Sequence, residues 1–341
     1  MKVLFRADGS KEIGMGHLTR CADIAKELNG RHIETTFLTR SDPPAMKFLR
    51  KTGNKVMRIP NRLTIRQEIN HAQTSLRRSH IDCVVADLLL DQGAQRINRL
   101  KTPCNKLITL TDDTKARRIR QITSDILFAF SPSLTDKDLR GSKSKVYYVG
   151  PGYFPLKPSF GEQTIRIRNK VRNILVTLGG SDPTNNTVFV LETLERIALP
   201  GVRVNVIAGP ASGILNILQK KKYTCKVTIM HDVDDMLPIM MKTDIAICSA
   251  GNTLLELIAV GAPTIVLPHT RRENENAAVY ERKGCILKTR SFGNRVARSD
   301  LTTLTQKLIS DKPSRVRLNN NCRGIIEGKG LNRLIELIEG S

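Results

Sequence analysis

The sequence has no tryptophan, and aromatic residues make up only 4% of its 341 residues. Valine, isoleucine and leucine must therefore supply most of the core packing, which is typical of α/β proteins. No run reaches the roughly 18 apolar residues of a membrane-spanning helix, and the first residues lack the long apolar segment of a signal peptide. We therefore expect a cytoplasmic protein.

Paired cysteines are also absent. The seven cysteines are an odd number, are widely scattered and form no Cys-x-x-Cys pair. Most of them lie inside apolar runs, which is typical of core residues in a reducing compartment.

Acidic residues are scarce, because 32 aspartates and glutamates face 55 lysines and arginines, for a formal charge of +23. Such a charge is typical of proteins that bind nucleic acid, an anionic membrane surface or an anionic substrate. The basic residues are scattered and lack interleaved aromatic residues, so we expect no nucleic-acid partner. We favour steering of a diphosphate substrate, and peripheral contact with an anionic membrane surface stays open. The oligomeric state is not indicated.

Strand and helix patterns alternate along the whole chain, which predicts parallel sheets covered by helices. The length suits two domains, and segment 150–158, with three prolines and two glycines, predicts the boundary. We place an N-terminal Rossmann-like domain at 1–155 and a C-terminal one at 156–341, with a ligand cleft between them. Strands are expected at 2–7, 32–38, 55–59, 83–87, 106–110, 125–130, 146–149, 173–177, 202–207, 226–230, 244–248 and 264–267. Helices are expected at 18–28, 185–197, 235–241, 253–260 and 274–283.

The segment SAGNTLLELIAVGAP at 249–263 is the most informative part of the chain. A buried strand precedes it, Gly251 allows a close backbone approach, and the amides from Asn252 and Thr253 onward open a helix, where an anion binds well. Glu256 follows one turn later, where a carboxylate can accept hydrogen bonds from both hydroxyls of a ribose. The pattern predicts a nucleoside diphosphate site.

A second constellation follows the first strand. Gly14 and Gly16 form a flexible turn before His17, which lies in the first turn of a helix whose dipole favours the neutral imidazole. We predict that His17 is a general base. Asp8 and Asp87 each end a strand and are the expected groups to orient the imidazole, although capping or solvation of a strand end is an equal alternative.

The second half contains further candidates for ligand contact. Gly179, Gly180 and Ser181 form another glycine turn between a strand and a helix, and two such turns beside one ligand suit a diphosphate-linked sugar. Asn274 and Glu275 open a later helix and are further candidates. The acidic segment 231–235 has the spacing of a magnesium site, but helix capping explains it better, so we expect no metal.

Several of these motifs resemble a known family. The segments RADGSKEIGMGHLTR at 6–20, VTLGGSDP at 176–183 and 249–263 resemble the UDP-sugar hydrolases of pseudaminic acid biosynthesis, which cleave UDP from a diacetamido-trideoxy-altropyranose. The segments 150–158 and 328–333 are also similar to that family. The second half is in addition similar to the nucleotide-binding domain of the glycosyltransferase that makes lipid II. The resemblance implies a GT-B fold, UDP held mainly by the second domain with Glu256 on the ribose, a sugar facing His17, and a reaction without metal or cofactor.

One departure from the family pattern concerns substrate choice. The hydrolases typically have Asp-His-Tyr where this chain has Asp87, Leu88 and Leu89. Two polar groups are lost, so the sugar recognised is expected to differ. We predict hydrolysis of a UDP-linked amino or deoxy sugar at the anomeric carbon with inversion, in nonulosonic acid or surface polysaccharide biosynthesis. A glycosyltransferase that uses the same site and a non-catalytic nucleotide-sugar binding protein are the alternatives.

Overall fold

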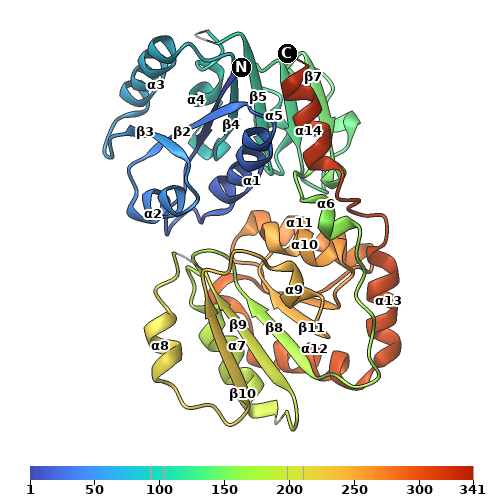
Figure 1. Ribbon diagram of the computed structural model, residues 1–341. Helices are drawn as coiled ribbons and strands as arrows, with labels where there is room; N and C mark the ends of the chain where they lie inside the picture. Colours follow the sequence, from blue (N-terminus) through green and yellow to red (C-terminus); the bar gives the residue numbers. More distant parts are fainter. Residues whose placement is uncertain (93, 103, 198, 210, 341) are drawn as a thin grey trace. The chain divides into compact units, whose positions relative to one another are not determined.

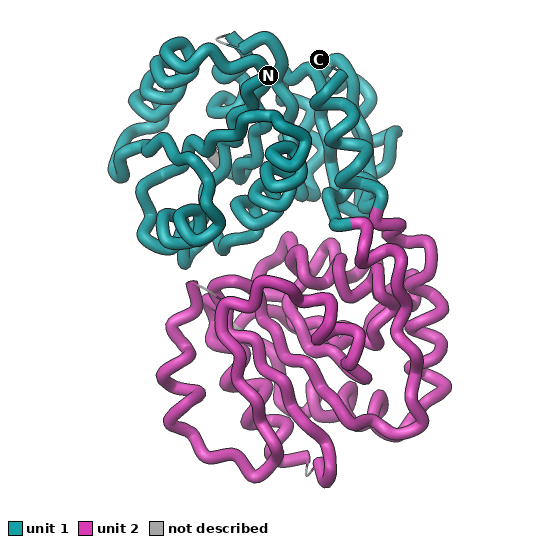
Figure 2. The backbone as a smooth tube through the Cα atoms, in the orientation of Figure 1, with its two compact units in different colours: residues 1–157, 329–341 teal, residues 158–328 magenta. Residues whose placement is uncertain are grey.

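The computed structural model describes residues 1–340 apart from 93, 103, 198 and 210 (Figure 1). The chain forms two compact units, one made of Met1–Lys157 with Lys329–Ser341 and the other of Pro158–Gly328 (Figure 2). Each unit is a parallel sheet with helices. No helix in the described part of the chain is both long and apolar enough to cross a bilayer.

The first unit contains a seven-stranded parallel sheet in the order β3-β2-β1-β4-β5-β6-β7. Its strands are β1 (Lys2–Ala7), β2 (Glu34–Arg40), β3 (Lys55–Ile59), β4 (Cys83–Asp87), β5 (Lys106–Thr111), β6 (Ile126–Ala129) and β7 (Val146–Val149). Its helices are α1 (Gly16–Gly30), α2 (Pro43–Lys51), α3 (Ile65–Ser79), α4 (Gln95–Asn98), α5 (Ala116–Ile119) and α14 (Gly330–Glu339), with 3-10 turns at Leu90–Gln92, Asp136–Leu139 and Pro151–Tyr153.

The second unit contains a six-stranded parallel sheet in the order β10-β9-β8-β11-β12-β13. Its strands are β8 (Asn173–Thr177), β9 (Arg203–Ala208), β10 (Lys226–His231), β11 (Ile245–Cys248), β12 (Thr264–Val266) and β13 (Leu287–Lys288). Its helices are α6 (Pro158–Gly161), α7 (Asn186–Ile197), α8 (Leu215–Lys220), α9 (Leu237–Met240), α10 (Asn252–Ala259), α11 (Arg271–Arg282), α12 (Arg298–Ser310) and α13 (Lys312–Cys322), with a 3-10 turn at Gly293–Arg295.

Both sheets reverse their strand order at one point. In the first sheet the chain builds outward from β1 to β3 and then returns to place β4 on the other side of β1. In the second sheet β8 and β11 are neighbours in the same way. In open parallel sheets a ligand binds beyond the carboxyl ends of the two strands at such a switch point. The topology therefore marks the ends of β1 and β4 and the ends of β8 and β11 as sites.

The central strands are buried along their whole length, as expected for sheets with helices on both faces. All residues of β4 and of β11 are buried. Full burial explains why both strands appear in the sequence as apolar runs. Every predicted strand matches a strand of the structure within a few residues. Among the described strands, β13 alone has no predicted counterpart, because a strand of two residues leaves no periodic pattern.

The last helix, α14, belongs to the first unit. The second domain predicted from the sequence, 156–341, included this helix. Residue 341 itself lies outside the described residues. Gly330 begins α14, and a Cβ added there would lie 2.0 Å from the carbonyl oxygen of Phe154. Arg333 donates from Nη1 to the carbonyl oxygen of Gly152 at 2.9 Å, and its guanidinium lies over the ring of Tyr153. These contacts, which helical periodicity does not encode, return the chain to the first unit.

The chain enters and leaves the second unit at neighbouring points. A Cβ added to Gly161, at the end of α6, would lie 2.2 Å from the carbonyl oxygen of Glu327. The entering and leaving segments of this unit therefore touch at backbone distance, and glycine is required there because any side chain would collide with backbone.

Candidate functional site

His17 lies at the switch point of the first sheet, beside the end of β4. The loop before it turns at Gly14, whose φ of +79° is the left-handed conformation that favours glycine. The amide of Ser10 donates to the carbonyl oxygen of Gly14 at 3.2 Å and closes the loop, and α1 then begins at Gly16. His17 is thus fixed in the first turn of α1 with 5% of its surface exposed.

Asp87, the last residue of β4, orients the His17 ring. Its Oδ1 lies 2.7 Å from Nδ1 of His17. Burial raises the pKa of Asp87, but the charge of Arg20 and the contact with His17 lower it more, so its pKa is below its usual value. An ionised carboxylate only accepts hydrogen bonds, so we assign the ring proton to Nδ1 and the acceptor lone pair to Nε2. A neutral imidazole with Nε2 free of its proton is the form that acts as a base.

Arg20 completes this group and was missed in the sequence analysis as a site residue. Its Nε and Nη2 donate to the two carboxylate oxygens of Asp87, each at 2.5 Å, and Nη2 lies 3.0 Å from Nδ1 of His17. Residues three apart share a helix face, so His17 and Arg20 both reach the end of β4 from α1. That spacing is the signal from which Arg20 could have been found.

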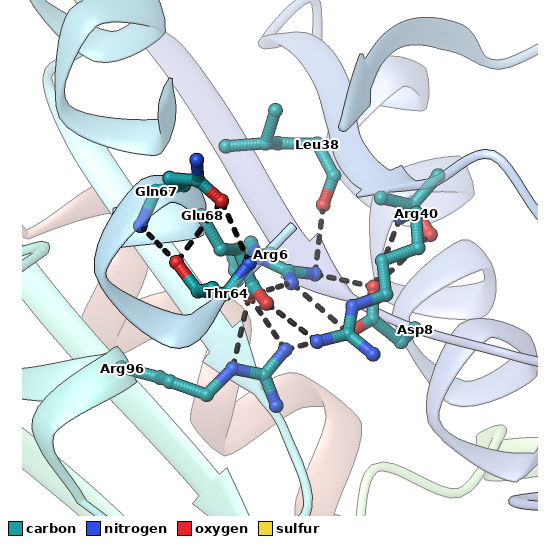
Figure 3. A network of polar contacts seen from close by, with 9 residues as sticks. Arg6, Asp8, Leu38, Arg40, Thr64, Gln67, Glu68 and Arg96 are labelled. Carbon is teal, nitrogen blue, oxygen red and sulfur yellow. Dashed lines mark hydrogen bonds and ion pairs between the residues drawn. The ribbon is translucent and has the colours of Figure 1, made fainter. Parts of the chain in front are cut away.

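Asp8 does not take the role predicted for it. Its Oδ1 accepts from Nη1 of Arg6 at 2.6 Å and from the amide of Arg40 at 3.0 Å, and its Oδ2 accepts from Nη2 of Arg96 at 3.0 Å. The orientation of the imidazole thus comes from Asp87, while the carboxylate of Asp8 is engaged by arginines. Figure 3 shows this second cluster, which we call the arginine network: Arg6, Asp8, Arg40, Glu68 and Arg96.

Glu68 is the centre of the arginine network. Its Oε1 accepts from Arg6 at 2.7 Å and from Arg96 at 2.6 Å, and its Oε2 accepts from Arg40 at 2.6 Å (Figure 3). Burial raises the pKa of Glu68, but the three guanidinium groups lower it more, so the carboxylate is ionised at neutral pH. No local pattern predicts this network, because α3 brings Glu68 to Arg6 of β1 and Arg40 of β2 across 62 and 28 residues.

A pocket of about 250 Å³ opens beside His17. The arginine network forms one wall through Asp8, Arg40 and Arg96, and Leu88 and Leu89 supply apolar surface. Ser10, Glu12, Ile13, Asp42 and Asp87 complete the lining. The two leucines that differ from the hydrolase pattern therefore line the same pocket as His17.

Replacing Glu68 with alanine is expected to lower the free energy of unfolding by about 3–5 kcal/mol, because it leaves buried guanidinium groups without their carboxylate. The pKa of Glu68 is lowered in the fold, so its contribution is present at neutral pH and is lost as the pH falls through the folded value. Urea denaturation at pH 7 and at pH 3.5 measures both effects. Glu34→Ala is the matched control, because the ion pair of Glu34 with Lys55 lies at the exposed surface. An equal loss in both variants would contradict the assignment.

The glycine turns of the second unit lie together at its switch point. Gly179 follows β8 with a φ of +83°, and a Cβ added to it would lie 3.2 Å from Oγ of Ser249, which follows β11. Gly180 and Ser181 continue the first loop and are partly exposed. Gly209, which was not predicted, packs so tightly that its Cβ would lie 2.5 Å from Gly180. Two polar loops therefore share one edge of the sheet.

Helix α10 begins at this edge. Gly251 is its N-cap residue, and Asn252 and Thr253 form its first turn, partly exposed. Glu256 lies one turn further and is also partly exposed. Because the amides at a helix start attract anions, the edge has the features that the sequence predicted for a diphosphate beside a ribose.

Two residues that the sequence analysis missed hold these loops in place. His269 donates from Nε2 to the carbonyl oxygen of Leu178 at 2.9 Å and accepts at Nδ1 from the hydroxyl of Thr184 at 2.8 Å. Glu273 accepts from the amides of His269 at 2.8 Å and Ala250 at 3.4 Å. The capping pattern Thr270-x-x-Glu273, in which the Thr270 hydroxyl accepts from the Glu273 amide, was the readable signal.

The remaining candidates occupy the start of α11 and the acidic segment. Oδ1 of Asn274 is buried and has no hydrogen-bond partner among the described residues, whereas Glu275 accepts from Nε of Arg271 at 3.2 Å. Asp235, which precedes the N-cap residue Met236 of α9, accepts from the amide of Leu237, the first residue of that helix, at 3.1 Å. The part of the chain that the model describes contains no group of three or more His, Cys, Asp or Glu placed to hold a metal ion.

Known proteins share this architecture. Residues 173–319 match the model of the glycosyltransferase family 28 C-terminal domain. The structure of MurG from Acinetobacter baumannii superposes with a TM-score of 0.69 and 15% identity over 100% of this chain and 99% of that one. The glycotransferase of kitacinnamycin gives a TM-score of 0.68 with 16% identity, over 99% and 98%. The chain has the GT-B fold. The predicted fold class is thereby confirmed.

The curated relatives are distant from this chain in sequence. An uncharacterized protein of Methanocaldococcus jannaschii is 29% identical over 83% of this chain, which spans 59% of that protein. The spore coat polysaccharide biosynthesis protein SpsG of Bacillus subtilis is 26% identical over 99% of this chain and 98% of its own length. The UDP-2,4-diacetamido-2,4,6-trideoxy-beta-L-altropyranose hydrolase of Campylobacter jejuni is 20% identical over 83% and 97%. The resemblance to the hydrolases is therefore supported only as a distant one.

Proposed function

We propose that the protein hydrolyses a UDP-linked amino or deoxy sugar at the anomeric carbon, with inversion, and releases UDP and the free sugar. The observation that carries the proposal is the hydrogen bond from Nδ1 of His17 to Asp87, which leaves Nε2 as a base beside a polar pocket. The full-length similarity to a spore coat polysaccharide biosynthesis protein supports a role in building a surface polysaccharide.

The proposed reaction needs one base and one anion site. Nε2 of His17 takes a proton from water while the water oxygen bonds to the anomeric carbon on the face opposite the diphosphate. The bond from that carbon to the diphosphate oxygen breaks, and its electron pair leaves with UDP. An anion site, such as backbone amides at a helix start provide, stabilises the departing charge. No covalent intermediate and no second carboxylate are required, because UDP is already a good leaving group.

A glycosyltransferase is the second candidate, and a specific observation favours it. The nucleotide half of the chain matches a glycosyltransferase domain model. In that reaction the hydroxyl of an acceptor takes the place of water, and the same histidine removes its proton. The two candidates therefore share the base and the nucleotide site and differ only in what enters the pocket beside Leu88 and Leu89.

Product analysis separates the candidates. Purified protein is incubated with a panel of UDP-sugars, with and without polyol, lipid-linked and peptidoglycan-precursor acceptors, and UDP release is measured while NMR follows the anomeric signal. Free sugar of inverted configuration without any acceptor supports hydrolysis. Release that depends on an acceptor supports transfer. UDP binding without release from any UDP-sugar would contradict both and favour a non-catalytic binding protein.

Replacing Glu256 with alanine is expected to weaken UDP binding by about 1–3 kcal/mol, the cost of a lost hydrogen bond to a charged group. Calorimetric titration with UDP and with 2′-deoxy-UDP tests the ribose assignment. Wild type is expected to discriminate between the two ligands, and Glu256→Ala is expected to bind both alike. Glu281→Ala, on the exposed face of α11, is the control. Unchanged discrimination in Glu256→Ala would remove this residue from the ribose.

A further inference from the structure

Arg20 is a buried cation that the proposed hydrolysis does not use directly. Its side chain is 2% exposed, and its guanidinium lies over the ring of Phe130, 5.5 Å from the ring centre. Two of its nitrogens hold the two oxygens of Asp87, so the carboxylate has one fixed orientation. Such a bidentate pair restricts rotation of the carboxylate in a way that a single hydrogen bond does not.

The same guanidinium lies 3.0 Å from Nδ1 of His17. An ionised carboxylate alone beside an imidazole favours the imidazolium, because opposite charges attract. A permanent cation at this distance opposes that effect, since it neutralises Asp87 and repels a second positive charge. Arg20 therefore offsets the attraction of Asp87 for a second proton on the ring, while Asp87 still orients the ring.

We propose that Arg20 is a positioning residue for the reaction: it aligns Asp87 with Nδ1 of His17 and offsets the negative charge of that carboxylate beside the imidazole. The inference rests on the proposed function, because it assigns Arg20 a task only if His17 is a base. It concerns the charge balance of the His17, Arg20 and Asp87 group and not the nucleotide site.

Other charged and titratable groups also face the group formed by His17, Arg20 and Asp87. Asp112, after β5, lies 3.8 Å from Nη1 of Arg20 and is one-third exposed, so it adds a second, weaker counter-charge. The Cys21 thiol lies 3.7 Å from Asp87, and burial raises its pKa well above its usual value, so it stays neutral. On the pocket side lie Asp8, Glu12 and Asp42, with Arg40 and Arg96. Arg20 is the cation that touches both His17 and Asp87.

The first test compares Arg20→Gln with wild type in the pH dependence of kcat/KM. Loss of the cation favours the imidazolium paired with Asp87, so the acidic limb of the profile is expected to move to higher pH. Turnover is expected to fall about 10-fold or more at pH 7 and to recover toward the wild-type level at alkaline pH, since one pH unit corresponds to a tenfold change in the fraction of free base. The KM for the UDP-sugar is expected to stay the same. A loss that is uniform across pH would overturn the proposal and leave Arg20 a structural residue.

Arg20→Lys separates charge from alignment and serves if Arg20→Gln does not fold. Lysine keeps a positive charge but has no planar fork for two oxygens. Its acidic limb is expected to stay near the wild-type position, with kcat several-fold lower. Wild-type kcat in Arg20→Lys would overturn the alignment role, and a shifted limb in this variant would overturn the charge role.

A measurement without turnover separates this inference from the proposed function. Nitrogen-15 NMR of labelled histidine shows which ring nitrogen carries the proton at each pH, and the His17 signals are identified by their loss in His17→Asn. The single proton of the neutral wild-type ring is expected on Nδ1, and Arg20→Gln is expected to show a larger imidazolium fraction than wild type at the same pH. If this change occurs but no UDP-sugar is hydrolysed, the proposed function fails and the charge balance stands. If hydrolysis occurs without this change, the role of Arg20 fails alone.

Discussion

Replacing His17 with asparagine is expected to lower kcat by about 10²- to 10⁴-fold, the usual contribution of a general base, while UDP binds as before. Asparagine is close in size and can still bond to Asp87, so the α1 turn is retained. Its amide cannot take a proton from water. The UDP-release assay measures kcat, and calorimetric titration measures the affinity for UDP.

His80→Asn is the matched control for this prediction. His80 is exposed and follows α3 in the left-handed conformation, with a φ of +47°, where asparagine is well tolerated. The control carries the same chemical change and is expected to keep wild-type kcat. Equal losses of turnover and of UDP affinity in His17→Asn would contradict the assignment of His17 as a base acting on water.

Replacing Asp87 with asparagine is expected to lower kcat over a similar range and to destabilise the fold by about 3–5 kcal/mol, because the buried Arg20 cannot lose its charge and keeps only the weaker, partly exposed counter-charge of Asp112. The amide of asparagine can also donate to Nδ1, which would place the ring proton on Nε2 and remove the base. Turnover and urea denaturation at pH 7 measure the two effects separately.

The pH dependence of the Asp87→Asn effect has a definite sign. The pKa of Asp87 is lowered in the fold, so the stability that it contributes is present above its ordinary value of about 4 and is lost as the pH falls through the folded value. The gap between wild type and variant should therefore narrow in acid. Asp112→Asn, which removes the weaker and more exposed contact of Arg20, should cost little. A gap that stays constant down to pH 2 would show that the loss is one of packing.

Local patterns in the sequence were enough to locate the ends of the important strands. Asp87 was predicted because a buried strand ends on it, and His17 because two glycines precede it at a helix start. Strand order decided which of these ends meet, and the switch points bring the candidates in each unit together. Asp8 shows the limit of this reasoning, because it directly follows β1, near the switch point where Asp87 ends β4, and yet bonds to arginines.

The arginine network could not be predicted from spacing, because its four members besides Asp8 lie on β1, β2, α3 and α4, and most of its contacts join residues far apart in the sequence. Arg40 and Glu68 lie 28 residues apart, and Arg96 and Asp8 lie 88 apart. Arg20 and Glu273 differ from them, since a three-residue helical spacing and a capping pattern respectively contain the information. Local periodicity also does not record which sheet a terminal helix covers, so α14 was assigned to the wrong domain.

The contact between Gly161 and Glu327 has a practical consequence for dissecting this chain. The second unit is an insertion whose two ends meet, so residues 158–328 could be expressed as a separate fragment without stretching its termini. The first unit would then need only a short linker between Lys157 and Lys329, because Gly330 already lies against Phe154. Nucleotide affinity and histidine chemistry could be measured on different polypeptides, and circular permutation at this junction would move the chain ends without cutting either sheet.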